Sequence, residues 1–315
     1  MHAPVERDPR TRVKIGIALG GGAARGWSHI GVMRVLTEAG IVPDVIAGCS
    51  IGAVVGGCFA AGKLDELESF ANSLTKRRVM GLLDFHITGS GLIAGGRLQR
   101  LLNQDLTDLR VESLPIRFCT IATELGTGHE IWLTRGPLVQ AMRASYALPG
   151  LFDPVLIGGH WLMDGALVNP IPITAARALG ADIVICVNLN GEVRARGTVI
   201  QSYDAETTDE DELEAAMGEP RRWGIFAPPR LNRLRKPEAP GIATVMVDAF
   251  NITQDRIARS RLAGDPPDVM ISPKLAKMGL FEFHRAQESI ELGRQAAERA
   301  LPDISEMIRE SETAT

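Results

Sequence analysis

A single serine, Ser50, stands between Gly48 and Gly52 in the segment "GCSIG". A short apolar run typical of a buried strand precedes this segment, and a run of small residues that fits a helix follows it. Small neighbours allow a sharp turn from strand into helix, which holds a serine hydroxyl outward above the start of the helix. A tight glycine turn without any chemistry would give the same short pattern. The strand before it and the helix after it favour a nucleophilic serine.

A second glycine-rich segment, "LGGGAARG" at residues 19–26, also lies between a predicted strand and a predicted helix. One interpretation is a phosphate cradle, because helix N-termini bind anions. Its spacing fits poorly, since the sixth residue counted from Gly20 is arginine where a dinucleotide motif has glycine. The other interpretation is an oxyanion hole, in which the backbone N–H groups of Gly21, Gly22 and Ala23 stabilise the charge that develops when a serine attacks an ester. This second interpretation accounts for both glycine-rich segments.

A hydrolytic serine needs a base, and histidine is the usual one. None of the six histidines lies in a segment that resembles a catalytic loop, and His29 falls inside the first predicted helix, where a core or surface position is expected. The other candidate is Asp164, which ends a short apolar run and precedes Gly165, a residue that permits close approach to a ligand. An isolated Asp-Gly pair is also a common turn. The residue types alone therefore leave the base open.

Predicted strands and helices alternate along the chain, which indicates an α/β fold with three layers: a mainly parallel central sheet with helices on both faces. The predicted strands are 13–19, 44–48, 116–124, 129–136 and 182–190, with a short one at 268–273 and a short strand or turn at 160–165. The predicted helices are 27–40, 50–62, 65–77, 137–147, 171–180, 241–264 and 283–301.

The composition changes strongly near residue 191, where an acidic block is followed by a block rich in proline and arginine. We expect this charged insert to be mobile, either as a flap whose Trp223 and Phe226 cover an acyl pocket or dock on lipid, or as a flexible linker. The predicted organisation is a tail at 1–12, a catalytic domain at 13–190, the charged insert at 191–240, and a C-terminal helical segment at 241–315 that completes the same domain.

Composition excludes several classes of protein. With 315 residues, 45% of them apolar, and a net charge of −4, the chain suits a large globular domain and lacks the basic surplus of a nucleic-acid binder. The N-terminus has no apolar stretch of the secretory type, and the uncharged run 45–62 is built mostly from small residues, so a strand and a helix fit it better than a membrane span. We expect a cytoplasmic protein that meets membranes only at their surface. Its cysteines lack metal-site spacing and are expected to be buried thiols: Cys49, Cys58, Cys119 and Cys186.

Several motifs in their order resemble those of the patatin-like phospholipases. The resemblance runs from about Val13 to Val187, and a C-terminal segment, 261–286, looks like that of stand-alone bacterial members related to the catalytic domain of neuropathy target esterase. The matching segments are the glycine-rich loop with Arg25-Gly26, the serine turn 48–52, the Asp164-Gly165-Ala166 segment, and the stretches 122–136 and 144–154.

The resemblance implies a patatin-like fold and a serine hydrolase that cleaves lipid acyl esters, as a phospholipase, lysophospholipase or esterase, through a Ser-Asp dyad and an acyl-enzyme. Ser50 would be the nucleophile and Asp164 the base that accepts its proton. Arg25 would fix the glycine loop or offset anionic charge, and Ala23 stands where a third glycine is commoner. The resemblance implies no metal or other cofactor. Alternatives on the same fold are a regulatory or lipid-binding protein with little turnover, and an acyltransferase or thioesterase.

Overall fold

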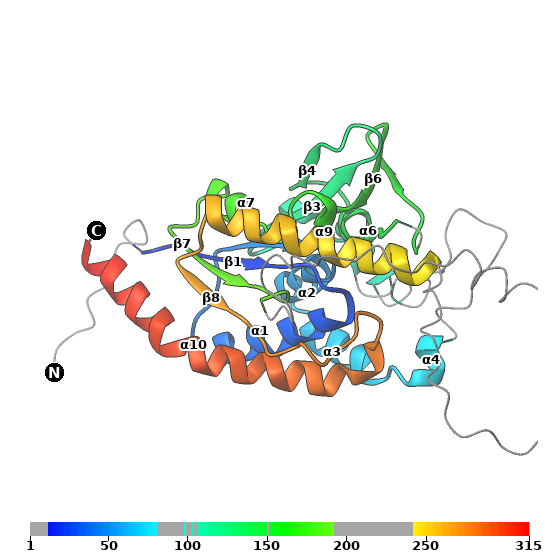
Figure 1. Ribbon diagram of the computed structural model, residues 1–315. Helices are drawn as coiled ribbons and strands as arrows, with labels where there is room; N and C mark the ends of the chain where they lie inside the picture. The colour runs from blue at the N-terminus through cyan, green and yellow to red at the C-terminus, as the bar shows by residue number, and fades with distance from the viewer. Residues whose placement is uncertain are drawn as a thin grey trace, which may run out of the picture. The chain divides into compact units, whose positions relative to one another are not determined.

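The computed structural model describes residues 12–80, 98, 102–103, 106–149, 151–191 and 242–314. Within these residues, eight strands form one sheet in the order β5-β6-β3-β2-β1-β7-β8, and β4 pairs with β3 (Figure 1). The strands are β1 (Ile15–Leu19), β2 (Val45–Cys49), β3 (Arg117–Glu124), β4 (Glu130–Leu133), β5 (Val155–Ile157), β6 (His160–Asp164), β7 (Ile183–Val187) and β8 (Val269–Ile271). Each predicted strand is present, and β5 is an addition that the sequence did not indicate.

The sheet has a parallel part and an antiparallel extension. Strands β3, β2, β1, β7 and β8 pair in parallel, whereas β4 and β6 run antiparallel to β3, and β5 runs antiparallel to β6. Every residue of β1, β2 and β7 is buried, which explains why these strands are continuous apolar runs. The predicted mainly parallel sheet is confirmed.

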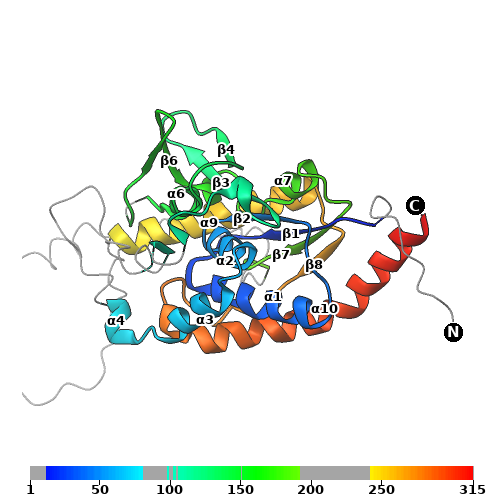
Figure 2. The same ribbon diagram turned by 180° about the vertical axis from the view of Figure 1, so that it is seen from behind.

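Helices cover both faces of this sheet (Figures 1 and 2). One core lies between the sheet and α1 (Ser28–Glu38), α2 (Ile51–Ala60) and α10 (Ala286–Ala314), and it contains Ile17, Leu19 and Ile46. A second core, on the opposite face, contains Ala18 and Ala47 from the same strands together with residues of α7 (Ile173–Ala178) and α9 (Ile242–Gly264). The three-layer architecture follows from this alternation of strand residues between the two cores.

The remaining helices surround these layers. They are α3 (Leu64–Asn72), α4 (Lys76–Met80), α6 (Leu138–Tyr146) and the short 3₁₀ turns η1 (Ala23–Trp27), η2 (Val111–Ser113), η3 (Gly165–Leu167) and η4 (Phe283–Arg285). The predicted C-terminal helix ended at residue 301, before Pro302, and this was wrong, because α10 continues through that proline to Ala314. Ile304 is fully buried, and its packing holds this part of the helix on the core.

Residues 1–193 and 249–315 form one compact unit, and residues 194–248 form a second unit. The proposed flap residues Trp223 and Phe226 lie outside the described residues, as does most of the predicted N-terminal tail.

The run 45–62 divides into β2 and α2, with Ser50 between them. In the described segments, every helix is too short or too polar to traverse a bilayer. The four cysteines are buried thiols, as predicted.

Candidate active site

Ser50 occupies a strained turn between β2 and α2. Its backbone has φ 54° and ψ −122°, in the region that residues with a side chain rarely adopt. Among the described residues, Ala23 is the one other non-glycine residue with a positive φ, so both strained positions fall in the two glycine-rich segments. A side chain at Gly52 would put its Cβ 2.2 Å from the Leu19 carbonyl oxygen, and one at Gly48 would put it 2.6 Å from the Ala53 Cα. Glycine is therefore required on both sides of the serine.

The path of β3 brings Asp164 to this turn. Strand β2 ends at Cys49, which lies opposite Ile121 of β3, and β6 ends at Asp164, which lies opposite the next residue, Ala122. Both strands pair with β3, and they end at neighbouring positions along it. Ser50 and Asp164, 114 residues apart in the chain, therefore meet at one point of the sheet.

The two side chains are joined by a short hydrogen bond. The Ser50 Oγ hydroxyl donates to Asp164 Oδ2 at 2.6 Å, and the Ala166 N–H donates to the other carboxylate oxygen, Oδ1, at 2.9 Å. Asp164 is 2% exposed and Ser50 is 8% exposed. The carboxylate is thus oriented by two donors, and its contact with water is nearly lost.

Burial sets the basicity of this carboxylate. Desolvation raises the pKa of Asp164 from its ordinary 3.8 to about 7, although the hydrogen bonds from Ser50 and from the Ala166 N–H act in the opposite direction. A carboxylate with a pKa near the working pH accepts a proton far more readily than a solvated one does. The site therefore has a basic group in hydrogen-bond contact with a hydroxyl.

Three further contacts hold the backbone of these two residues in place, and the sequence did not single out the residues that make them. Ser145 Oγ, in α6, accepts the Ser50 N–H at 2.9 Å. The Asp164 N–H donates to the Ala147 carbonyl at 2.9 Å, and Thr123 Oγ1 donates to the Asp164 carbonyl at 2.8 Å. All three partners fall in stretches that resembled the family motifs, but nothing in those stretches indicated which side chain would reach the serine turn.

The glycine-rich loop lies directly beside this pair. A Cβ built at Gly21 would lie 3.3 Å from the Ala166 Cβ and 3.5 Å from the Ser50 Cβ. The Gly21 N–H is not free, because it donates to the Pro170 carbonyl at 2.9 Å. The N–H groups of Gly22 and Ala23 have no acceptor among the described residues. Of the three predicted donors, two therefore remain available to a ligand.

Arg25 anchors the loop to the C-terminal part of the chain. Its Nε donates to the Met278 carbonyl at 3.0 Å, and the Ala24 N–H donates to the Leu280 carbonyl at 2.9 Å. Ser289 Oγ, in α10, donates to the Arg25 carbonyl at 3.1 Å. These contacts fit the first of the two roles considered for Arg25, which is to fix the glycine loop.

The described histidines do not hydrogen-bond to Ser50 or Asp164. His29 is fully buried in α1 and donates from Nε2 to the Gly20 carbonyl at 2.8 Å, which makes it a core residue beneath the glycine loop. Burial lowers the pKa of His29 to about 4, so the ring is neutral near neutral pH. In the described part of the chain, no three His, Cys, Asp or Glu side chains are grouped so as to hold a metal ion.

Replacement of His29 by leucine tests whether this contact positions the glycine loop. The Gly20 carbonyl would lose its buried donor, and the loop that it belongs to would lose one of its fixed points. If the loop acts as the expected oxyanion hole, kcat on a soluble ester should fall about tenfold to hundredfold, with KM nearly unchanged, because oxyanion donors act on the transition state more than on the ground state. Steady-state kinetics measure this split. An unchanged kcat would mean that the contact is structural only.

Comparisons with known proteins find relatives that match most of this chain. The family model of the patatin-like phospholipases matches residues 17–177, which is half of the chain. An uncharacterized NTE family protein of Mycobacterium bovis is 33% identical over 96% of this chain and 95% of its own length. Lysophospholipase NTE1 of Yarrowia lipolytica is 25% identical over 93% of this chain, and neuropathy target esterase sws of Drosophila melanogaster is 28% identical over 77% of it. These two relatives are much longer, since the matches cover 20% and 17% of their lengths.

The family match includes the glycine loop, the serine turn and the Asp-Gly segment, and the relatives extend the similarity to the C-terminal part of the chain that holds Arg25. This chain belongs to the patatin-like phospholipase family and is related to the NTE proteins within it.

Proposed function

We propose that this protein hydrolyses acyl esters of lipids with Ser50 as nucleophile and Asp164 as the base, without a histidine. The proposal rests on one observation above all, the 2.6 Å hydrogen bond between Ser50 Oγ and Asp164 Oδ2 in a site that is almost closed to water. The family to which the chain belongs acts on lipid esters, and two of its relatives are named lysophospholipase and esterase. Lysophospholipids and phospholipids are therefore the substrates to test first.

The reaction proceeds in two halves that use the same carboxylate. Ser50 Oγ attacks the ester carbonyl carbon while its proton passes to Asp164, and the carbonyl oxygen becomes negatively charged. The Gly22 and Ala23 N–H groups donate to that oxyanion. When the carbon–oxygen bond to the alcohol breaks, Asp164 returns the proton to the leaving oxygen, and an acyl-Ser50 remains. A water molecule then gives its proton to Asp164 and attacks the acyl carbon, and Ser50 regains its proton as the fatty acid leaves.

Purified protein assayed on lysophosphatidylcholine and on p-nitrophenyl esters of short and long acyl chains tests this function. We expect release of free fatty acid and of alcohol in equal amounts, with none from the Ser50→Ala variant. Adding an acceptor alcohol distinguishes acyl transfer, because a transferase would make a new ester in place of the fatty acid. Tight lipid binding without release of either product would instead favour the regulatory alternative.

The pH dependence of the reaction follows from the buried carboxylate. Asp164 must be ionised to accept the Ser50 proton, and burial raises its pKa to about 7. We expect kcat/KM on a soluble ester to be constant above that pH and to fall about tenfold per unit below it. A pH profile in the free enzyme measures this value directly. A profile that stays flat down to about pH 5 would contradict a desolvated aspartate as the base.

A further inference from the structure

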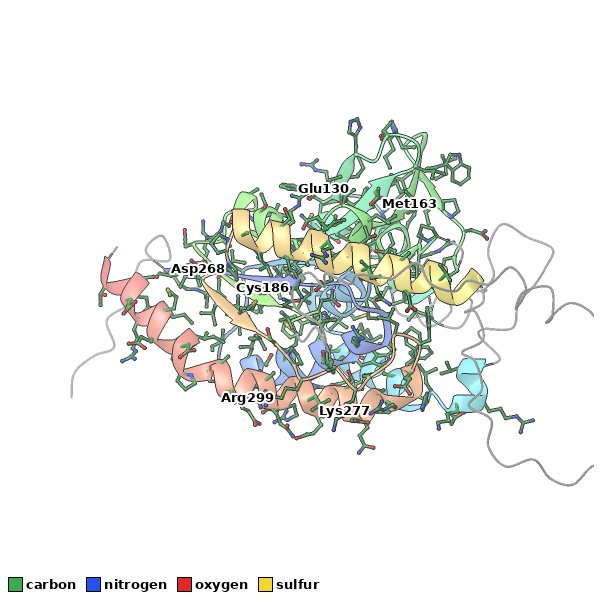
Figure 3. All side chains as sticks on the ribbon, in the orientation of Figure 1. Glu130, Met163, Cys186, Asp268, Lys277 and Arg299 are labelled. Atoms are coloured by element: carbon green, nitrogen blue, oxygen red, sulfur yellow. The ribbon has the colours of Figure 1, made fainter. Side chains whose placement is uncertain are left out.

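The antiparallel extension ends in two neighbouring turns with exposed apolar side chains. Leu125 follows β3, and Leu156 and Trp161 lie on either side of the turn between β5 and β6. These three residues, here called the tip patch, are 50%, 48% and 51% exposed. Met163 and Glu130, labelled in Figure 3, mark the same extension nearer to the body of the sheet.

The three side chains of the tip patch share one face. Leu156 lies directly opposite Trp161 in the β5–β6 pair. The Leu125 N–H donates to the Trp161 carbonyl at 2.8 Å, which continues the β3–β6 pairing beyond Glu124. Residues that lie opposite each other in antiparallel strands point to the same side, so the patch is continuous across three strands. Val42 and Met270 are exposed to a similar degree but lie outside these two turns.

The two turns carry no full charge. Neither 125–129 nor 155–161 contains Asp, Glu, Lys or Arg, although 23% of the chain is charged. Glu124, which precedes the first of these turns, is held by the Thr127 hydroxyl at 2.6 Å and by the His160 ring, and its side chain is 14% exposed. The tip patch could therefore enter a less polar medium without removing a carboxylate or ammonium group of these two turns from water.

These properties fit a lipid surface better than a second copy of the chain. The surface area of three half-exposed side chains is far smaller than the ~800 Å² that each partner buries in a stable protein interface. Tryptophan and leucine at an uncharged tip are instead well suited to the boundary between headgroups and acyl chains, where an indole ring has both an apolar and a polar neighbour. The strength of such attachment scales with the apolar area that enters the membrane, so a small patch fits weak and reversible binding.

We propose that the tip patch inserts into the interfacial zone of a lipid bilayer and holds the active site at the membrane surface. The choice of lipid as the partner rests on the proposed function. Trp161 and Asp164 lie on the same short strand, three residues or about 10 Å apart, with their side chains on opposite faces of it. A bilayer that binds the end of this strand therefore lies within about 10 Å of the backbone of the proposed base. Attachment at this point brings the enzyme to aggregated lipid and leaves the chemistry at Ser50 unchanged.

Sedimentation with vesicles tests the proposal. We expect wild-type protein to bind vesicles of phosphatidylcholine mixed with phosphatidylglycerol, and the Leu156→Ser, Trp161→Ser double variant to partition at least about tenfold more weakly. The matched control is the Val42→Ser, Met270→Ser double variant, which removes two equally exposed apolar side chains outside the patch. It should bind like the wild type. Should the first double variant fail to fold, Leu125→Asn tests the same patch at its other end.

Two further readouts keep the result unambiguous. Activity on a short soluble ester should stay the same in the patch variant, while activity on vesicle lipid falls at least about tenfold. Vesicle binding is also measured with Ser50→Ala, so the attachment is tested even if the protein hydrolyses nothing. Equal binding by the patch variant and wild type, absence of binding by wild type, or a change of oligomeric state in place of a change in binding would each overturn the proposal.

Discussion

Ser50→Ala is expected to lower ester hydrolysis by about 10⁴-fold or more, and Asp164→Asn by about 10³-fold to 10⁴-fold. The first variant has no nucleophile, and the second keeps the shape of the side chain but has no carboxylate to accept the proton. Because the two groups act as one unit, the double variant should be about as inactive as either single variant. Initial rates on one soluble ester, measured at equal protein concentration, make this comparison.

The stability of Asp164→Asn provides the control for folding. The pKa of Asp164 rises from 3.8 in the unfolded chain to about 7 in the folded protein, so the folded state binds the proton more tightly. This contribution to the free energy of unfolding is fully present below pH 3.8 and is lost as the pH rises toward 7, with a size of about 4 kcal/mol. At pH 8 the neutral asparagine should therefore be more stable than the aspartate. An inactive and stabilised variant would separate lost chemistry from lost structure.

An Asp164→Asn variant that keeps more than about a tenth of wild-type activity would contradict the dyad, since that loss is far below the effect of removing a general base. A double variant that is much less active than both single variants would also contradict the dyad. Either result would return attention to a different base, and His29 is the buried imidazole closest in the chain to the glycine loop.

Gly31→Val is expected to destabilise the protein by about 3–5 kcal/mol. A Cβ at Gly31 in α1 would lie 2.0 Å from the Ile290 carbonyl oxygen and 2.7 Å from the Arg294 nitrogen of α10. On the other helix, a Cβ at Gly293 would lie 2.0 Å from the Ser28 carbonyl oxygen. These neighbours are backbone atoms, so the two helices would have to separate and would lose the apolar contacts between them.

Gly264→Ala is the matched control, because Gly264 ends helix α9 and a Cβ there meets nothing within 4 Å. Urea unfolding should show a large shift of the midpoint for Gly31→Val and almost none for Gly264→Ala. The ester activity of Gly31→Val should fall as well, since α10 holds the glycine loop through the Ser289 contact with the Arg25 carbonyl. Equal midpoints for the two variants would mean that α1 and α10 are not packed as closely as the structure has them.

Much of the fold was predictable because the buried strands are short apolar runs that local pattern reveals. The antiparallel extension was not, since β4 and β6 have the same residue types that a parallel strand would have, and their direction depends on pairing with β3. Strand β5 is three residues long and is half exposed at Leu156, so it gives no alternating pattern. The direction of β4 and β6 and the presence of β5 depend on pairing between segments far apart in the chain.

The candidate site, like the fold, could be predicted from the sequence only in part. Ser50 and Asp164 could be singled out because their glycine neighbours and strand ends are local features of the sequence. The Ser145 hydroxyl that accepts the Ser50 N–H, and the Pro170 carbonyl that occupies the Gly21 N–H, could not, because each contact joins segments far apart in the chain. A serine in α6 looks like any other helical serine until the fold brings it to the turn.

Covalent labelling by a fluorophosphonate, followed by peptide mass spectrometry, tests the central claim most directly. The reagent reacts with a serine whose hydroxyl is activated by a base and whose developing charge is stabilised by nearby N–H groups. We expect one adduct, on Ser50, in the wild-type protein, formed in step with the loss of ester hydrolysis and greatly slowed in Asp164→Asn. An adduct on a different residue, or full inactivation with Ser50 unmodified, would contradict it.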